Sequence, residues 1–196
     1  INRIMSDYSI LDLKKSIEKL NLKKGETLYV SANIINLGIL KNKNTNNIPE
    51  LFYNELKKKL GKYGTIAFPT HTFNLVQEKE VFDPLKTLSI SGSFSNYLIK
   101  EKKIYRQFHP YGSISATGYN AKFICQCKNK NVYGINSPFE KLIKLNTRFL
   151  SIGIPINLNC TQVHHAELMM KVPYRYQKKF THSVRSEEHT SELQSP

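Results

Sequence analysis

The sequence predicts an α/β domain in which a layered sheet carries helices on both faces. Two observations support this: apolar segments with strand character alternate with segments of helical periodicity, and glycines follow the helical segments. Such alternation is typical of a sheet covered by helices on either side. A chain of 196 residues with 40% hydrophobic content can bury one sizeable core, so we expect a single domain over residues 1–184.

The predicted strands are short apolar runs. They are TLYVSANI (27–34), TIAFPT (65–70), the shorter SISA (113–116) and RFLSIGI (148–154). Each runs out into a polar loop. In open α/β sheets ligands bind where strands end, so these loops are the expected location of a site.

The predicted helices show one apolar face or a start signal. LDLKKSIEKLNL (11–22) places Leu13, Ile17 and Leu20 on one face, and Gly25 follows as a stop. At Ser137-Pro138 a serine cap precedes a proline at the first helical position. The other predicted helices are PELFYNELKKKL (49–60), SGSFSNYLIKEKK (91–103) with its capping serines, and YNAKFICQC (119–127).

Charge and composition exclude several classes of protein. The net charge of +14 comes from lysines spread along the polar faces of predicted helices, so we expect no nucleic-acid partner, although a basic surface attracts anionic ligands. No run approaches the ~18 apolar residues of a membrane span, and no export leader is recognisable. Cys125, Cys127 and Cys160 lack metal-ligand spacing and indicate free thiols in the cytoplasm.

The last twelve residues, RSEEHTSELQSP (185–196), differ from the rest and resemble a translated sequencing-library adapter. We interpret this tail as non-native. The chain has 29 basic and 15 acidic residues, and the tail contributes one arginine and three glutamates. The native part therefore has 28 basic and 12 acidic residues, a net charge of +16. We also expect the domain to be partial, incomplete at its C-terminus.

Three histidines stand near strand ends. His71 follows the second strand, His109 lies in the loop before SISA, and His164 comes after the RFLSIGI strand, in CTQVHHAE. If Thr161 caps a helix, His164 and Glu167 lie at positions i and i+3 on one face. The carboxylate can then orient the imidazole as a general base. The alternative is that His165 and Glu167 are solvated and His164 packs in the core.

Two other chemistries stay open for these residues. A metal site would need His71 or His109 besides His164, since His164 and His165 point about 100° apart on a helix. A metal-dependent hydrolase using His71, His109 and His164 is therefore one alternative. A Cys160–His164 nucleophilic pair, at i and i+4, is another.

Read together, the loops resemble the aminoglycoside 3-N-acetyltransferase family, also called antibiotic N-acetyltransferases. The resemblance rests on KGETLYVSANIINLG, on KYGTIAFPTHTF, on NSPFEKL and on CTQVHHAE, which matches a T-x-x-H-x-x-E ending. The block FDPLKTLSISGSFSNYLIKEKKIYRQFHPYGSISATGYNA also follows the pattern of the family. The resemblance covers nearly all of residues 10–180.

This resemblance implies an enzyme that transfers acetyl from the co-substrate acetyl-coenzyme A to an amine of an aminoglycoside or other amino sugar, without a metal. It implies that His164 is the general base, that Glu167 orients it and that Thr161 belongs to the same turn. It also implies that Ser31, Asn33, His109 and Ser113 lie beside the coenzyme A arm, the thioester or the acceptor. We leave open a homodimer.

The sequence departs from the family pattern at its first strand, where His-Ser-Ser is replaced by Ser31, Ala32 and Asn33. An inactive or binding-only homologue is therefore the remaining alternative. The excess of basic residues favours a neutral or anionic amino sugar over a strongly cationic drug.

Overall fold

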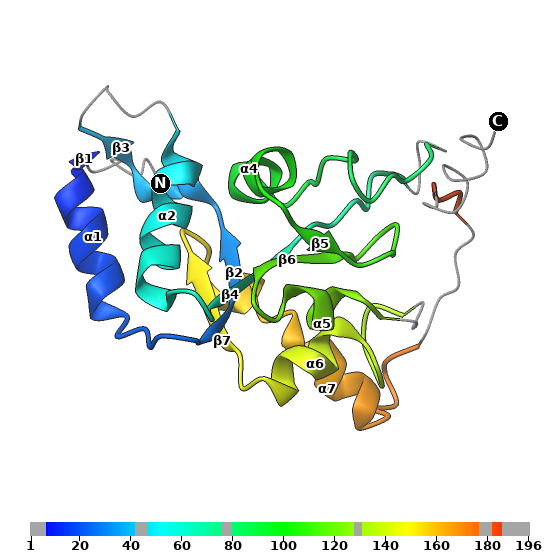
Figure 1. Cartoon of the computed structure of the whole chain (residues 1–196). Coiled ribbons are helices and arrows are strands. Elements are labelled where there is room, and N and C mark those ends of the chain that lie inside the picture. The colour runs from blue at the N-terminus through cyan, green and yellow to red at the C-terminus, as the bar shows by residue number, and fades with distance from the viewer. Residues whose placement is uncertain (1–6, 42–46, 76–79, 128–130, 177–181, 186–196) are drawn as a thin grey trace.

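The computed structural model describes residues 7–41, 47–75, 80–127, 131–176 and 182–185, and a five-stranded sheet lies at its centre (Figure 1). The strands are β2 (Thr27–Ala32), β4 (Thr65–Pro69), β5 (Tyr105–Arg106), β6 (Ile114–Gly118) and β7 (Arg148–Ile152). Their order across the sheet is β5-β6-β4-β2-β7. β2 pairs in parallel with β4 and β7, whereas β6 runs antiparallel to β4 and β5. The four predicted strands are confirmed, and β5 is an addition to them.

Both faces of the sheet are buried, which explains why its central strands read as continuous apolar runs. All six residues of β2 are buried. Because side chains alternate along a strand, Leu28 and Val30 enter one hydrophobic cluster and Tyr29 enters the other. In β4, Phe68 and Ala67 divide between the two clusters in the same way.

Three helices cover the first face, and they are α1 (Ile10–Lys19), α2 (Ile48–Leu60) and α4 (Ser93–Glu101). Leu13 and Ile17 of α1 are buried there, as the periodicity predicts. α1 begins with a capping box, in which the Ser9 hydroxyl accepts from the Asp12 N–H and the Asp12 carboxylate accepts from the Ser9 N–H. Between α2 and α4, the rings of Phe52 and Phe94 meet edge to face at 5.7 Å.

Two shorter helices, α5 (Ala121–Cys125) and α6 (Pro138–Lys144), cover the second face. Ser137 caps α6 by accepting a hydrogen bond from the Glu140 N–H at 3.3 Å, and Pro138 occupies the first turn, so this predicted start is confirmed. The ring of Phe139 packs on Tyr29 of β2 at 5.8 Å. Helices therefore lie on both faces of the sheet, as predicted.

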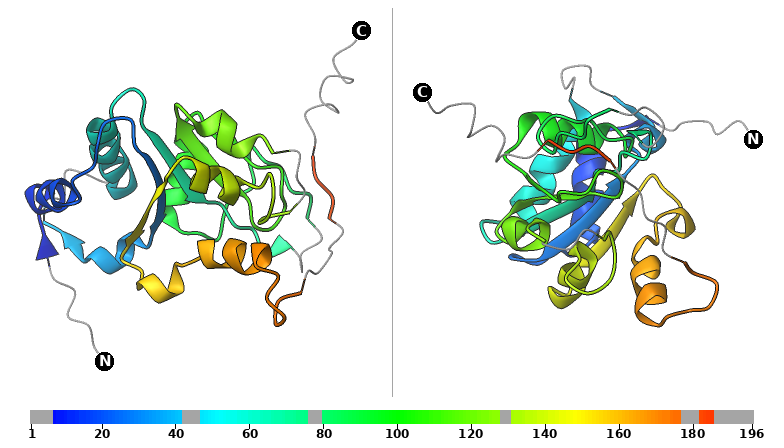
Figure 2. Two further views of the ribbon diagram at one scale, coloured as in Figure 1. Left: turned by 90° about the horizontal axis from the view of Figure 1, so that it is seen from below. Right: turned by 90° about the vertical axis from the view of Figure 1, so that its right-hand side faces the viewer.

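The remaining elements are β1 (Asp7–Tyr8), which pairs in parallel with β3 (Ile39–Leu40), the 3₁₀ turns η1 (Ile34–Leu37) and η2 (Ile156–Leu158), and α7 (Gln162–Met169). α7 packs beside α6, on the side of the sheet away from α1 and α2 (Figure 2). Of the helices in the described ranges, none has the length and apolar character needed to cross a membrane.

Several predicted boundaries are corrected by the structure. β2 ends at Ala32 rather than at residue 34, because Asn33 starts the turn of η1. β7 ends at Ile152, since Gly153 turns the chain with a φ of +62° and a side chain there would collide with the Asn33 carbonyl. The cap of α4 is Gly92, and no side chain caps that helix, so the predicted serine cap is wrong.

Candidate functional site

The loop after β7 leads through η2 to α7, which carries the predicted His164 and Glu167. Thr161 stands at the N-cap position, but its backbone is helical and its side chain makes no capping hydrogen bond. Its carbonyl accepts from the His164 N–H at 3.1 Å. The position of the helix start is therefore confirmed, whereas the capping role of the Thr161 side chain is wrong.

The Thr161 hydroxyl and that of Ser31 of β2 instead lie near the buried Tyr29 hydroxyl, which makes no hydrogen bond to any described residue. Burial raises the pKa of Tyr29, and these two hydroxyls act in the opposite direction. Ser31 pairs in register with Ser151 of β7 and is buried. The ends of β2 and β7 thus bring Ser31 and Thr161, which are far apart in sequence, to one place.

His164 and Glu167 form the predicted pair on one face of α7. Nδ1 of His164 lies 3.1 Å from Oε2 of Glu167, and 47% of the His164 side chain is exposed. Nε2 of His164 makes no hydrogen bond to any described residue. The hydrogen bond from His164, and then Arg175, lower the pKa of Glu167. The carboxylate is therefore ionised and accepts a hydrogen bond from Nδ1–H of His164. Nε2 of His164 is then left as the basic nitrogen of a half-exposed ring.

The neighbouring His165 has the opposite environment. It is buried, and its Nδ1 accepts a hydrogen bond from the Gly134 N–H at 3.1 Å. Burial lowers its pKa, so the ring is neutral at pH 7. The alternative in which His165 is solvated and His164 is a core residue is therefore wrong for both histidines.

Two further residues, which the sequence did not lead us to expect here, lie close to His164 and Glu167. Arg175 donates from Nε to Oε2 of Glu167 at 2.9 Å. Tyr133 presents its ring to His164 at 5.7 Å, and burial raises the pKa of its phenol to about 12. Neither residue has a fixed spacing from His164 on a helix, so no periodicity could have indicated them.

A second group of polar residues lies where β4 and β5 end and β6 begins. Arg106 donates to the Ser113 hydroxyl at 3.1 Å and to the Thr70 carbonyl at 2.8 Å, and the Ser113 hydroxyl donates to the same carbonyl at 2.7 Å. Ser113 is fully buried. Its hydroxyl therefore stabilises the end of β4, where Thr70 follows the strand.

His71 and His109 adjoin this group. Burial, and then the charges of Arg106 and His109, lower the pKa of His71 to about 4. Nδ1 of His109 accepts from the N–H groups of Tyr111 and Gly112, both at 3.2 Å, which places the proton of the neutral ring on Nε2.

Asn33 lies at the end of β2 and is exposed. Its backbone N–H donates to the Ile152 carbonyl at 2.9 Å. Both Asn33 and Ser31 therefore belong to the edge at which β2 and β7 end, beside the start of the path to α7.

The two alternatives with other chemistries gain no support. Within the described ranges, no three His, Cys, Asp or Glu side chains come together in a group that could hold a metal ion, so the predicted arrangement of His71, His109 and His164 is not formed. The Cys160 thiol donates to the Ile156 carbonyl at 2.9 Å rather than meeting His164.

Comparison with known structures identifies the fold. The chain superimposes on the aminoglycoside acetyltransferase AAC(3)-IVa with a TM-score of 0.75 and 24% identity, over 91% of this chain and 68% of the other. For AAC(3)-Xa the TM-score is 0.70 at 20% identity, over 83% and 61%. For AAC-IIIb, solved with CoASH, it is 0.70 at 23% identity, over 84% and 66%. At these identities the likeness establishes the fold, and the chain spans 61% to 68% of the length of these proteins.

The amino-acid sequence matches no curated protein sequence, but it does match a family model. A family model described as aminoglycoside 3-N-acetyltransferase matches residues 37–195. That range includes most of the tail at 185–196, of which only Arg185 is described, so the non-native origin of the tail stays a prediction. Because the match covers most of the chain, the family is established: the chain belongs to the aminoglycoside 3-N-acetyltransferase family.

Proposed function

We propose that the protein transfers acetyl from acetyl-coenzyme A to an amine of an amino sugar or aminoglycoside, with His164 as the general base. The observation that carries the proposal is the His164–Glu167 pair, in which Nδ1 of His164 is bound at 3.1 Å and 47% of the His164 side chain is exposed. Membership of the family and the related enzyme solved with CoASH support the same reaction.

In this reaction the amine nitrogen attacks the thioester carbonyl carbon. Nε2 of His164 takes a proton from the nitrogen as the new C–N bond forms. The C–S bond then breaks, and the His164 imidazolium returns that proton to the departing sulfur, so that coenzyme A leaves as a thiol. Glu167 holds the Nδ1–H of His164 and stabilises the imidazolium that forms. A general base of this kind typically raises the reaction rate by a factor of roughly 10²–10⁴.

For the co-substrate, we propose that Ser31, Asn33, His109 and Ser113 flank the coenzyme A arm or the acceptor. Asn33 is exposed at the edge where β2 and β7 end, and the Nε2–H of His109 is a donor. Ser113 would act through its position at the end of β4, because its hydroxyl is held by Thr70 and Arg106.

The charges near α7 favour a neutral or anionic amino sugar as the acceptor. The carboxylates of α6 and α7 are Glu140 and Glu167. Glu140 binds Lys144 and the Asn136 N–H, and Glu167 binds His164 and Arg175. A polycation would therefore meet no unpaired carboxylate on these two helices. The related AAC(3)-IVa, by contrast, has been solved with apramycin, so aminoglycosides must be tested beside simple amino sugars.

The test is a thiol-release assay with acetyl-coenzyme A and a panel of amino sugars and aminoglycosides. We expect turnover that falls at least 100-fold in His164→Ala. Met170→Ala is the matched control, because this exposed residue caps the same helix and should leave the rate unchanged. Turnover that survives His164→Ala would overturn the assignment of the base, and binding of coenzyme A without turnover would indicate a binding-only homologue.

A further inference from the structure

The carboxylate of Glu167 has three hydrogen-bond partners. His164 Nδ1 and Arg175 Nε both lie on Oε2, at 3.1 and 2.9 Å, while the Tyr174 hydroxyl donates to Oε1 at 3.5 Å. Charge-assisted hydrogen bonds of this kind fix the plane of a carboxylate more firmly than neutral ones. The side chain of Glu167 is therefore oriented from outside α7 as well as by its own helix.

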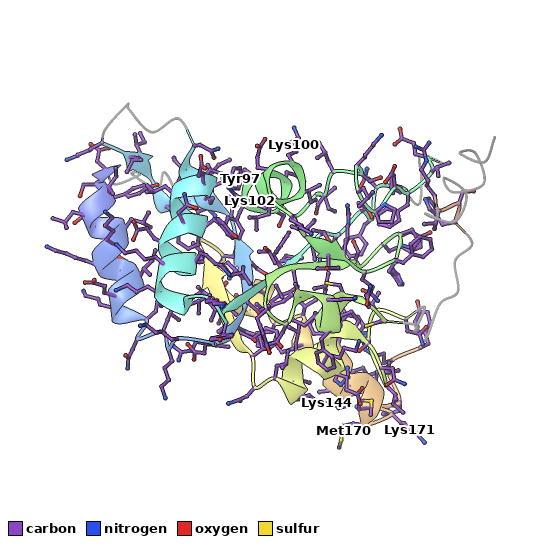
Figure 3. All side chains as sticks on the ribbon, viewed as in Figure 1. Tyr97, Lys100, Lys102, Lys144, Met170 and Lys171 are labelled. Carbon is purple, nitrogen blue, oxygen red and sulfur yellow. The ribbon has the colours of Figure 1, made fainter. Side chains whose placement is uncertain are left out.

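The end of α7 is built so that Arg175 returns to this carboxylate. Lys171 adopts a left-handed conformation with a φ of 53°, at the outer tip of the helix (Figure 3). Its N–H donates to the Leu168 carbonyl, and the Val172 N–H donates to the Glu167 carbonyl, which is the Schellman pattern of a helix C-terminus. Pro173 then prevents the helix from continuing. The chain thus turns back and places the guanidinium of Arg175 beside Glu167.

Tyr133 closes the arrangement from the other side. Its ring lies 5.7 Å from the His164 ring and 5.9 Å from the Arg175 guanidinium, and it packs on Phe139 of α6 at 5.0 Å. His164, Glu167, Arg175 and Tyr133 therefore form a closed ring of four side chains. Arg175 contacts two members of this ring, Glu167 and Tyr133, and His164 is the member that carries a basic imidazole nitrogen.

We propose that Arg175 is a positioning residue for the general base: it holds the Glu167 carboxylate against Nδ1 of His164 and offsets the charge of that carboxylate. The inference rests on the proposed function. It predicts two separate effects, because loss of the hydrogen bond releases the carboxylate, whereas loss of the positive charge leaves His164 beside an uncompensated anion. That anion would favour protonation of His164 at higher pH, which removes the base.

Among the described residues, several charged or titratable groups accompany His164 on or beside α7. Glu167 and the inward-facing His165 are on the same helix, Tyr133 contacts the His164 ring from the loop before α6, and Arg175 follows the turn together with Tyr174. On the neighbouring α6, Glu140 and Lys144 pair with each other at 3.3 Å. Arg175 is therefore the cation that directly contacts the carboxylate partner of His164 within the described residues.

The test compares Arg175→Gln and Arg175→Lys with the parent by pH–rate profiles. We expect Arg175→Gln to lower kcat about tenfold or more with little change in KM, and to move the acidic limb of the profile up by roughly one pH unit. Arg175→Lys restores the charge and should return the limb to the position of the parent, while only part of kcat is recovered, because an ammonium cannot reproduce the planar contact. A fall in kcat with an unmoved limb, or an unchanged kcat, would overturn the inference.

Arg148→Gln is the matched control. Arg148 binds Glu26 at 2.6 Å at the start of β7, at the end of the strand away from α7. Its loss should reduce stability without moving the acidic limb. If the parent shows no turnover, the proposed function fails but the positioning role is still tested, because an NMR titration of the His164 ring reports the same upward shift in Arg175→Gln. An unshifted titration would refute it.

Discussion

Acidification should destabilise the protein through His71. This ring follows β4, stacks on Phe73 at 5.0 Å, and its pKa is lowered to about 4 by burial and by the charges of Arg106 and His109. An exposed histidine in the unfolded chain has a pKa of about 6.5. As the pH falls below that value, the ring is protonated in the unfolded chain but stays neutral in the folded protein. The contribution of neutral His71 to the free energy of unfolding is therefore present at neutral pH and is lost as the pH falls towards 4.

The magnitude follows from these two values. Between pH 7 and pH 5 the unfolded form gains about 2 kcal/mol over the folded form from this one proton, and the full effect below pH 4 is about 3 kcal/mol. Because a domain is stable by only about 5–15 kcal/mol, such a change is readily measured.

The assay is urea denaturation of the parent and of His71→Phe at pH 7 and at pH 5. Phenylalanine keeps an aromatic ring against Phe73, and it removes the Nδ1 atom of His71, which is buried without a hydrogen-bond partner in the described part of the chain. We expect the parent to lose about 2 kcal/mol more than the variant on acidification. Equal losses in the two proteins would show that His71 is protonated in the folded state, and would refute the reasoning.

Two smaller perturbations test the helix ends. Ser137→Ala should lower the free energy of unfolding by about 1 kcal/mol in the same urea assay, because the Glu140 N–H loses its hydrogen-bond acceptor. Ser137→Thr keeps a hydroxyl and should retain most of the stability of the parent. An unchanged denaturation midpoint in the alanine variant would contradict this role of Ser137. Lys171→Gly should raise the thermal midpoint, since the left-handed conformation at this position costs a residue other than glycine about 1 kcal/mol, and a lower midpoint would show that the Lys171 side chain stabilises the turn.

The parts of the fold that follow from local rules were predictable from sequence. Apolar runs located the strands, and the serine–proline pair at Ser137 located the start of α6. Prediction failed where the backbone is set by contacts between distant segments. The end of β7 depends on Gly153 passing close to the carbonyl of Asn33, and β5 has only two residues, Tyr105 and Arg106, whose strand geometry comes from pairing with β6.

The candidate site divides in the same way. The relation between His164 and Glu167 is fixed by the period of a single helix, so spacing alone indicates it. Arg175 reaches Glu167 because Lys171 adopts a left-handed turn, and Tyr133 reaches His164 because its loop packs on α6. Neither condition leaves a pattern in the sequence.

The adjacent histidines show what decides their roles. Neighbouring residues on a helix differ by about 100°, so one can face the core while the other faces solvent, and the sequence HH does not say which. The Gly134 N–H determines which histidine faces the core, because it needs a buried acceptor and Nδ1 of His165 supplies one at 3.1 Å. With His165 committed inward, His164 must emerge on the exposed side, where Glu167 one turn later can meet it. The buried histidine therefore sets the rotation of α7 that presents the other histidine as a base.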